Sequence, residues 1–153
     1  MAVRTDERTP TRSELDAYNK AKKLTAHVMS VAKPKDKNVN NKHIPKRFAN
    51  VGKMLVADAI SIGADILEAN KGYYVGENLD KETLLENYAQ RIGLEQRALR
   101  FTFRLEHIYC VLNDEVHFAE STNKYMIDLI DELRAVLVKW IRSEKRKAKS
   151  LAE

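Results

Sequence analysis

The stretch STNKYMIDLIDELRAVLVKWIRSEKRK, residues 121–147, decides the fold class of this protein. Its large apolar side chains recur every three or four residues, which matches the 3.6 residues of an α-helical turn and not the alternation of a β-strand. We therefore expect one long amphipathic helix over residues 121–147, opened by Ser121. Its apolar stripe consists of Tyr125, Met126, Leu129, Ile130, Leu133, Val136, Leu137, Trp140 and Ile141.

Three further segments carry apolar residues at helical spacing and predict helices over residues 13–32, 45–70 and 80–112. Ser13 and Asp80 are suitable N-caps for the first and the third of them. Five Gly and three Pro in 153 residues are few, which favours long helices over a turn-rich sheet protein. The stripe of the third helix is apolar except at Glu95 and Thr102 and comprises Leu84, Tyr88, Ile92, Glu95, Leu99, Thr102, Leu105, Ile108 and Leu112.

Four amphipathic helices joined by polar connections can close around one core, so the expected fold is all-α, an antiparallel four-helix bundle. Connections that cross over the bundle also fit the sequence. Residues 13–149 form the bundle domain in this interpretation. Residues 1–12 are expected to be a disordered arm, and residues 150–153 a frayed tail.

The sequence also bears on the location of the protein. No apolar run approaches the roughly 18 residues that a membrane span needs, and the polar N-terminus lacks the features of a secretory signal. The single cysteine, Cys110, cannot form an intrachain disulfide. We expect a cytoplasmic protein without a membrane partner.

Signatures of enzyme chemistry are missing from the sequence. A ferritin-like di-iron site needs Glu-x-x-His on two helices, and none of the four histidines has a Glu three residues before it. Cys110 lies among apolar residues, so we expect a buried thiol, and its neighbour His107 has no third group to orient it. No glycine-rich phosphate loop is present. The sequence therefore predicts no catalytic residue, no metal and no cofactor.

Basic residues give the better indication of function. The net charge is +5, and the positive side chains gather in three clusters that would bind a phosphate backbone without reading its sequence. A merely solvated surface is the alternative. The clusters are Lys33, Lys35, Lys37, Lys42, Lys46 and Arg47 in and after the first linker; Arg97, Arg100 and Arg104 on the third helix; and Lys139, Arg142, Lys145, Arg146, Lys147 and Lys149, against Glu144 alone, at the end of the fourth.

Three short motifs resemble a known family of four-helix bundles. The segment Ile44-Pro45-Lys46-Arg47-Phe48 is similar to the Phe-Pro-Lys-type start of that family's second helix, with Ile44 in place of the aromatic. Ala59 to Asn70 resembles the end of the same helix, and Leu137 to Arg146 resembles a terminal Leu-x-x-Trp-x-x-Ser followed by basic residues. The family contains the accessory variability determinants of diversity-generating retroelements and the proteins encoded in 23S ribosomal RNA intervening sequences.

The resemblance, which covers roughly Leu15 to Lys147, implies a non-enzymatic homopentamer. It would bind a reverse transcriptase and its template RNA, with DNA a further ligand, and support mutagenic copying. The alternative within the family is a structural interaction bundle of the intervening-sequence type with no nucleic-acid role. The candidate contacts to nucleic acid or polymerase are Lys46, Arg47, Arg97, Arg100, Arg104, Lys139, Arg142, Lys145 and Arg146.

Overall fold

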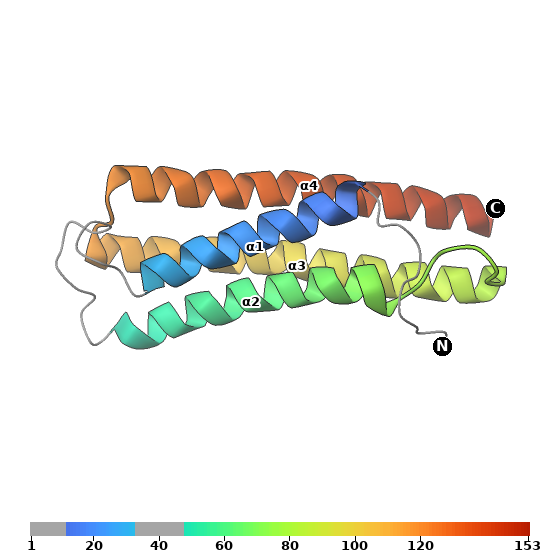
Figure 1. The fold of residues 1–153 in the computed structure, drawn as a ribbon, viewed down its shortest axis with the longest axis horizontal. Helices are drawn as coiled ribbons and strands as arrows, with labels where there is room; N and C mark the ends of the chain where they lie inside the picture. The colour runs from blue at the N-terminus through green and yellow to red at the C-terminus, as the bar shows by residue number, and fades with distance from the viewer. Residues whose placement is uncertain (1–11, 33–47) are drawn as a thin grey trace.

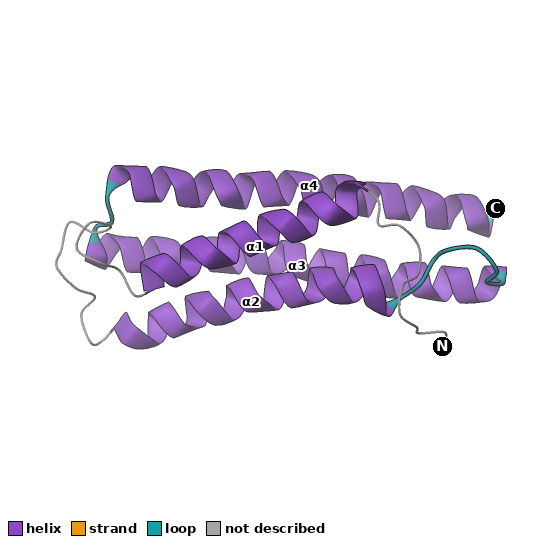
Figure 2. Ribbon diagram, viewed as in Figure 1, coloured by secondary structure: helices purple, strands orange, loops and turns teal. Residues whose placement is uncertain are grey.

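Four long helices make up the part of the chain that the computed structural model describes, residues 12–32 and 48–153. They are α1 (Arg12–Ala32), α2 (Ala49–Gly72), α3 (Lys81–Val116) and α4 (Glu120–Ala152). Successive helices run in opposite directions and lie side by side (Figures 1 and 2). The pairs that pack together are α1 with α2, α2 with α3, α3 with α4, and α4 with α1, so the helices form a closed ring of neighbours. The predicted all-α, antiparallel four-helix bundle is confirmed.

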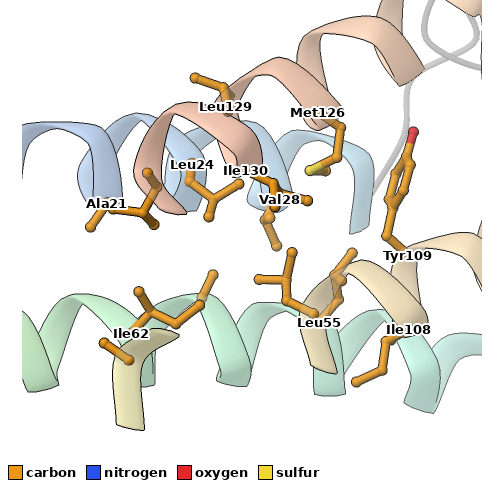
Figure 3. Packing of buried hydrophobic residues seen from close by; sticks show 14 of the residues in the cluster. Ala21, Leu24, Val28, Leu55, Ile62, Ile108, Tyr109, Met126, Leu129 and Ile130 are labelled. Atoms are coloured by element: carbon orange, nitrogen blue, oxygen red, sulfur yellow. The ribbon is translucent and has the colours of Figure 1, made fainter. Parts of the chain in front are cut away.

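The core lies along the axis of the bundle, where apolar stripes from all four helices meet. Figure 3 shows Leu24 and Val28 of α1, Leu55 of α2 and Ile130 of α4 pointing toward one another, and Ile108 of α3 belongs to the same cluster. Each fully buried side chain of this size contributes about 1.5–3 kcal/mol to stability. In α4 the predicted stripe supplies most of the core residues. Those that the structure buries are Met126, Leu129, Ile130, Leu133, Leu137, Trp140 and Ile141, whereas Tyr125 is half exposed.

The stripe predicted for α3 is wrong by one residue at two places. The structure buries Arg91 and Ala98, and it leaves their neighbours Ile92 and Leu99 partly exposed. Buried positions along α3 alternate in steps of three and four residues, through Tyr88, Arg91, Glu95, Ala98, Thr102, Leu105, Tyr109, Leu112 and Val116. Two charged side chains therefore occupy core positions.

Several helix ends differ from the sequence prediction. Helix α3 continues past Leu112 to Val116, because the side chain of Asn113 accepts a hydrogen bond from the Phe118 N–H (2.9 Å) and its backbone oxygen accepts one from the N–H of His117 (2.9 Å). His117 adopts a left-handed conformation, φ 57°, which ends the helix. Helix α4 begins at Glu120 and not at Ser121, and it reaches Ala152, so residues 150–152 are helical where a frayed tail was expected.

Other predictions fall on residues 1–11 and 33–47, which lie outside the described residues. They are the disordered arm, the basic linker, and the helix start at Pro45 with Lys46 and Arg47. Among the described helices, none is long and apolar enough to cross a membrane.

The start of α3 offers a test of local stability. The Asp80 carboxylate accepts a hydrogen bond from the backbone N–H of Thr83 (2.7 Å), as the capping prediction requires, and this bond lowers the pKa of Asp80. We expect Asp80→Ala to lower the urea midpoint of unfolding, because one backbone donor of the first turn loses its partner. Urea denaturation measures the loss, and an unchanged midpoint would contradict the capping role. Asp80→Asn, which keeps an acceptor, is the matched control.

Candidate polyanion-binding surface

The C-terminal half of α4 carries a row of basic side chains. Lys139, Arg142, Lys145 and Arg146 lie on its solvent-facing side, and their spacing places them on one face of the helix. They line a shallow hollow of about 640 Å³ together with Ala135 and Val138. We call these four residues the basic row. From Lys139 to Arg146 it covers about 10 Å of helix axis, at 1.5 Å per residue.

The acidic residue that the sequence places inside this row points the other way. Glu144 is 2% exposed, and its carboxylate accepts a hydrogen bond from Nε of Arg91 in the core (2.6 Å). It therefore does not neutralise the surface of α4. Within the described residues, no carboxylate forms an ion pair with a side chain of the basic row, nor with the nearby Lys147 and Lys149.

The arginines of α3 are placed differently. Arg97 donates to both carboxylate oxygens of Asp65 on α2, from Nε (2.9 Å) and Nη2 (2.5 Å), and this pairing raises the pKa of Arg97. Arg104 forms an ion pair with Asp58 (3.1 Å). Both arginines stay about half exposed while the two aspartates are buried. Much of the positive charge predicted for nucleic acid on this face is thus balanced by α2.

Arg100 is the exception among the three arginines. It is exposed, and the described part of the chain supplies no carboxylate partner for it. Burial raises the pKa of Asp58 even against the attraction of Arg104, so burying that carboxylate has a cost which the ion pair offsets in part.

Of the residues predicted to form the site, the structure brings together those of α4. It assigns Arg97 and Arg104 to the α2/α3 seam, and Lys46 and Arg47 lie outside the described residues.

A buried charge cluster holds the helices together behind the basic row. The guanidinium of Arg91, 1% exposed, donates to the carboxylates of Glu14 on α1 and Glu144 on α4. It also donates to the backbone oxygens of Ala69 (2.8 Å) and Tyr73 (3.2 Å) at the end of α2. One side chain of α3 thereby joins the other three helices. Its guanidinium lies 5.9 Å from the ring centroid of Trp140, which packs in the core.

Glu95, one turn further along α3, completes this charge cluster. It is fully buried, and neither of its carboxyl oxygens has a donor N–H or O–H partner within the described residues. Burial, together with the negative charge of Glu144, raises the pKa of Glu95 to about 10. With its pKa raised this far and no donor to stabilise a negative charge, Glu95 is a neutral acid at pH 7.

The structure also places the thiol of Cys110 and the described His, Cys, Asp and Glu side chains that could hold a metal ion. Cys110 is exposed, not buried as expected, and partial desolvation with the negative charges of Glu106 and Asp114 raises its pKa. Those surroundings disfavour the reactive thiolate. Among the described residues, no three His, Cys, Asp or Glu side chains lie together as metal ligands would. In the one cluster of buried glutamates found among them, the position between Glu14 and Glu144 belongs to Arg91.

A signal for the buried cluster was present in the sequence. Glu95 interrupts an otherwise apolar stripe, and a charge at a core position needs a buried partner.

Comparisons of the chain with family models, with curated proteins and with solved structures find no match.

Proposed function

We propose that this protein is a non-enzymatic, nucleic-acid-binding accessory protein of a diversity-generating retroelement. In this proposal it binds the template RNA or its cDNA through the basic row of α4 and associates with the reverse transcriptase, which performs the chemistry. It acts as a homo-oligomer in the cytoplasm. The retroelement context, the polymerase and the oligomer rest on the motif resemblance between Leu15 and Lys147.

The observation that carries the proposal is the unbalanced charge of α4. The solvent-facing Lys139, Arg142, Lys145 and Arg146 form no ion pair with a carboxylate of the described residues, and Glu144 is turned into the core. Clustered cations of this kind bind a phosphate backbone by releasing its condensed counterions. Lysine and arginine side chains on an open helix face contact phosphates, which are the same in every sequence, so binding that depends on charge more than on sequence is expected.

The hydrogen bonds of Arg91 hold the segment of α4 that carries the basic row in one orientation. Glu144 and the basic residues belong to the same two turns of α4, so the bonds of Arg91 fix the rotation of this segment about its axis. The row therefore faces outward in one orientation. Preorganised cations lose less conformational entropy on binding than mobile ones.

A salt titration with matched variants tests the proposal. Four phosphate contacts to single-stranded RNA predict a slope of about −3 for log affinity against log salt concentration. In Arg142→Glu/Arg146→Glu we expect affinity for a single-stranded RNA to fall at least tenfold and the slope to flatten by about 1.5, since each lost contact removes roughly 0.7. Fluorescence anisotropy of the nucleic-acid-free protein at several salt concentrations measures both quantities.

The control for this experiment reverses the same number of charges elsewhere. Lys23 on α1 and Lys53 on α2 are exposed and lie outside the basic row, so Lys23→Glu/Lys53→Glu keeps the net charge of the test variant. Equal losses in both variants would mean that RNA responds to net charge alone, and the assigned surface would be wrong. No RNA binding by the wild type at low salt would favour the structural interaction bundle, for which the internal pairing of Arg97 and Arg104 is the supporting observation.

A further inference from the structure

An apolar groove runs along the outer side of the seam between α1 and α2. It consists of two adjoining hollows, of about 430 Å³ and 510 Å³, that share Ile60. Met29 and Ile60 are each 51% exposed and Leu67 is 38% exposed, although all three are large apolar residues. Contiguous apolar surface of this kind marks an interaction site more often than scattered single residues do.

The two charged residues that line this groove have the same sign. Lys22 and Lys53 are its charged lining residues, and within the described residues neither has a carboxylate partner. The acidic residues Asp58 and Asp65 of α2 face α3, where they pair with Arg104 and Arg97. The groove therefore combines an apolar floor with unbalanced positive edges.

Small residues give the groove its depth. A side chain at Gly63 would enter open space, since an added Cβ would have no atom within 4 Å, whereas one at Gly52 would meet the backbone oxygen of Ala32 at 3.4 Å. Gly52 therefore allows α1 to approach α2 closely, whereas Gly63 opens the surface. Between Gly52 and Leu67 the groove follows about 23 Å of helix axis, or about four turns.

We propose that this groove binds an amphipathic helix of a partner protein, with apolar residues on one face and Asp or Glu along the edges of that face. A groove several turns long with an apolar floor suits the i, i+3, i+4, i+7 side chains of such a helix. The lysines select acidic flanks and disfavour basic ones. Residues 33–47 of the chain itself carry six Lys or Arg against one Asp, so their charge has the wrong sign for this groove.

The experiment uses a synthetic helical peptide of about 18 residues with a Leu/Ile face and glutamate edges, and a twin with lysine edges. Anisotropy is measured with the full-length protein. We expect the glutamate peptide to bind at least tenfold more tightly than the lysine peptide, and Lys53→Glu to reduce that preference at least fivefold. Arg142→Glu/Arg146→Glu should leave peptide binding unchanged, because the basic row is a different surface.

A steric variant provides the sharper test. Gly63→Leu places a side chain in the open space of the groove, and we expect it to reduce peptide affinity at least tenfold without loss of folded structure by circular dichroism. Gly93 is exposed on α3 and also has no atom within 4 Å of an added Cβ. Gly93→Leu is therefore the matched control, with full affinity expected.

Three results would overturn the proposal. The first is that the two peptides bind with equal affinity, or that neither peptide binds. The second is equal loss of affinity in Gly63→Leu and Gly93→Leu. The third is a self-associated wild type that Gly63→Leu converts to monomer in sedimentation velocity, because the groove would then hold a second copy of this chain.

Discussion

Replacing Arg91 by Met is expected to lower the free energy of unfolding by about 3–5 kcal/mol, the range measured when one partner of a buried ion pair is removed. The substitution keeps a side chain of similar length but leaves the buried carboxylates of Glu14 and Glu144 without their cation. The carbonyl groups of Ala69 and Tyr73 lose their donor as well. Urea denaturation at pH 7 measures the loss. A change below about 1 kcal/mol would show that the cluster is dispensable.

Two variants test whether the loss of stability comes from the buried cluster or would follow the removal of any arginine of α3. Arg100→Met removes an exposed arginine of the same helix and is expected to change stability by less than about 0.5 kcal/mol. Glu14→Gln/Arg91→Met/Glu144→Gln removes the unbalanced charges together with the cation. This triple variant should recover much of the stability lost in Arg91→Met, because uncompensated charge, more than lost attraction, causes the loss.

The sequence predicts the fold for a simple physical reason. An apolar stripe such as that of α4 follows from the backbone period of a single helix, so each helix reveals its buried face without knowledge of the others. The precision of this inference is about one residue, or about 100° of rotation. Within that margin the apolar pattern predicts Ile92 and not Arg91 in the core, because hydrophobicity alone ranks isoleucine above arginine at a core position.

The partners of buried charges depend on tertiary structure and cannot be predicted in the same way. Glu144 is 53 residues from Arg91 along the chain, and Glu14 is 77 residues away. In the sequence, Glu144 reads as an acid within a basic cluster, and Arg97 reads as an exposed cation. Their true environments depend on which helices are neighbours. The basic row of α4 could be predicted because it is local to one helix.

Glu95 gives the second large effect, and its sign follows from proton linkage. In the folded protein the pKa of Glu95 is raised to about 10 by burial and by Glu144, whereas an unfolded chain gives a glutamate its ordinary pKa. Between about pH 5 and pH 10 the folded state therefore holds a proton that the unfolded state releases. The contribution is fully present below the unfolded pKa and is lost as pH rises. Stability should fall by about 1.4 kcal/mol per pH unit from this group.

Glu95→Gln is expected to remove that dependence and to stabilise the protein. The amide is neutral at every pH, has nearly the same shape, and can donate to Glu144 through its NH₂ group. Because the variant takes up no proton on folding, its advantage over wild type should grow by about 1.4 kcal/mol per pH unit and reach about 3 kcal/mol at about pH 7. Denaturation of both proteins at acidic, neutral and alkaline pH (about 5.5, 7 and 8.5) gives this difference, from which other titrating groups such as His27 cancel.

An exposed glutamate of α3, Glu86, provides the control for this prediction. Glu86→Gln changes an exposed glutamate of the same helix, and its difference from wild type should stay within about 0.5 kcal/mol at all three pH values. If the Glu95→Gln difference were also constant with pH, Glu95 would be ionised in the core. The cluster would then hold three carboxylates against one guanidinium, and the excess negative charge would have to be balanced by a bound cation.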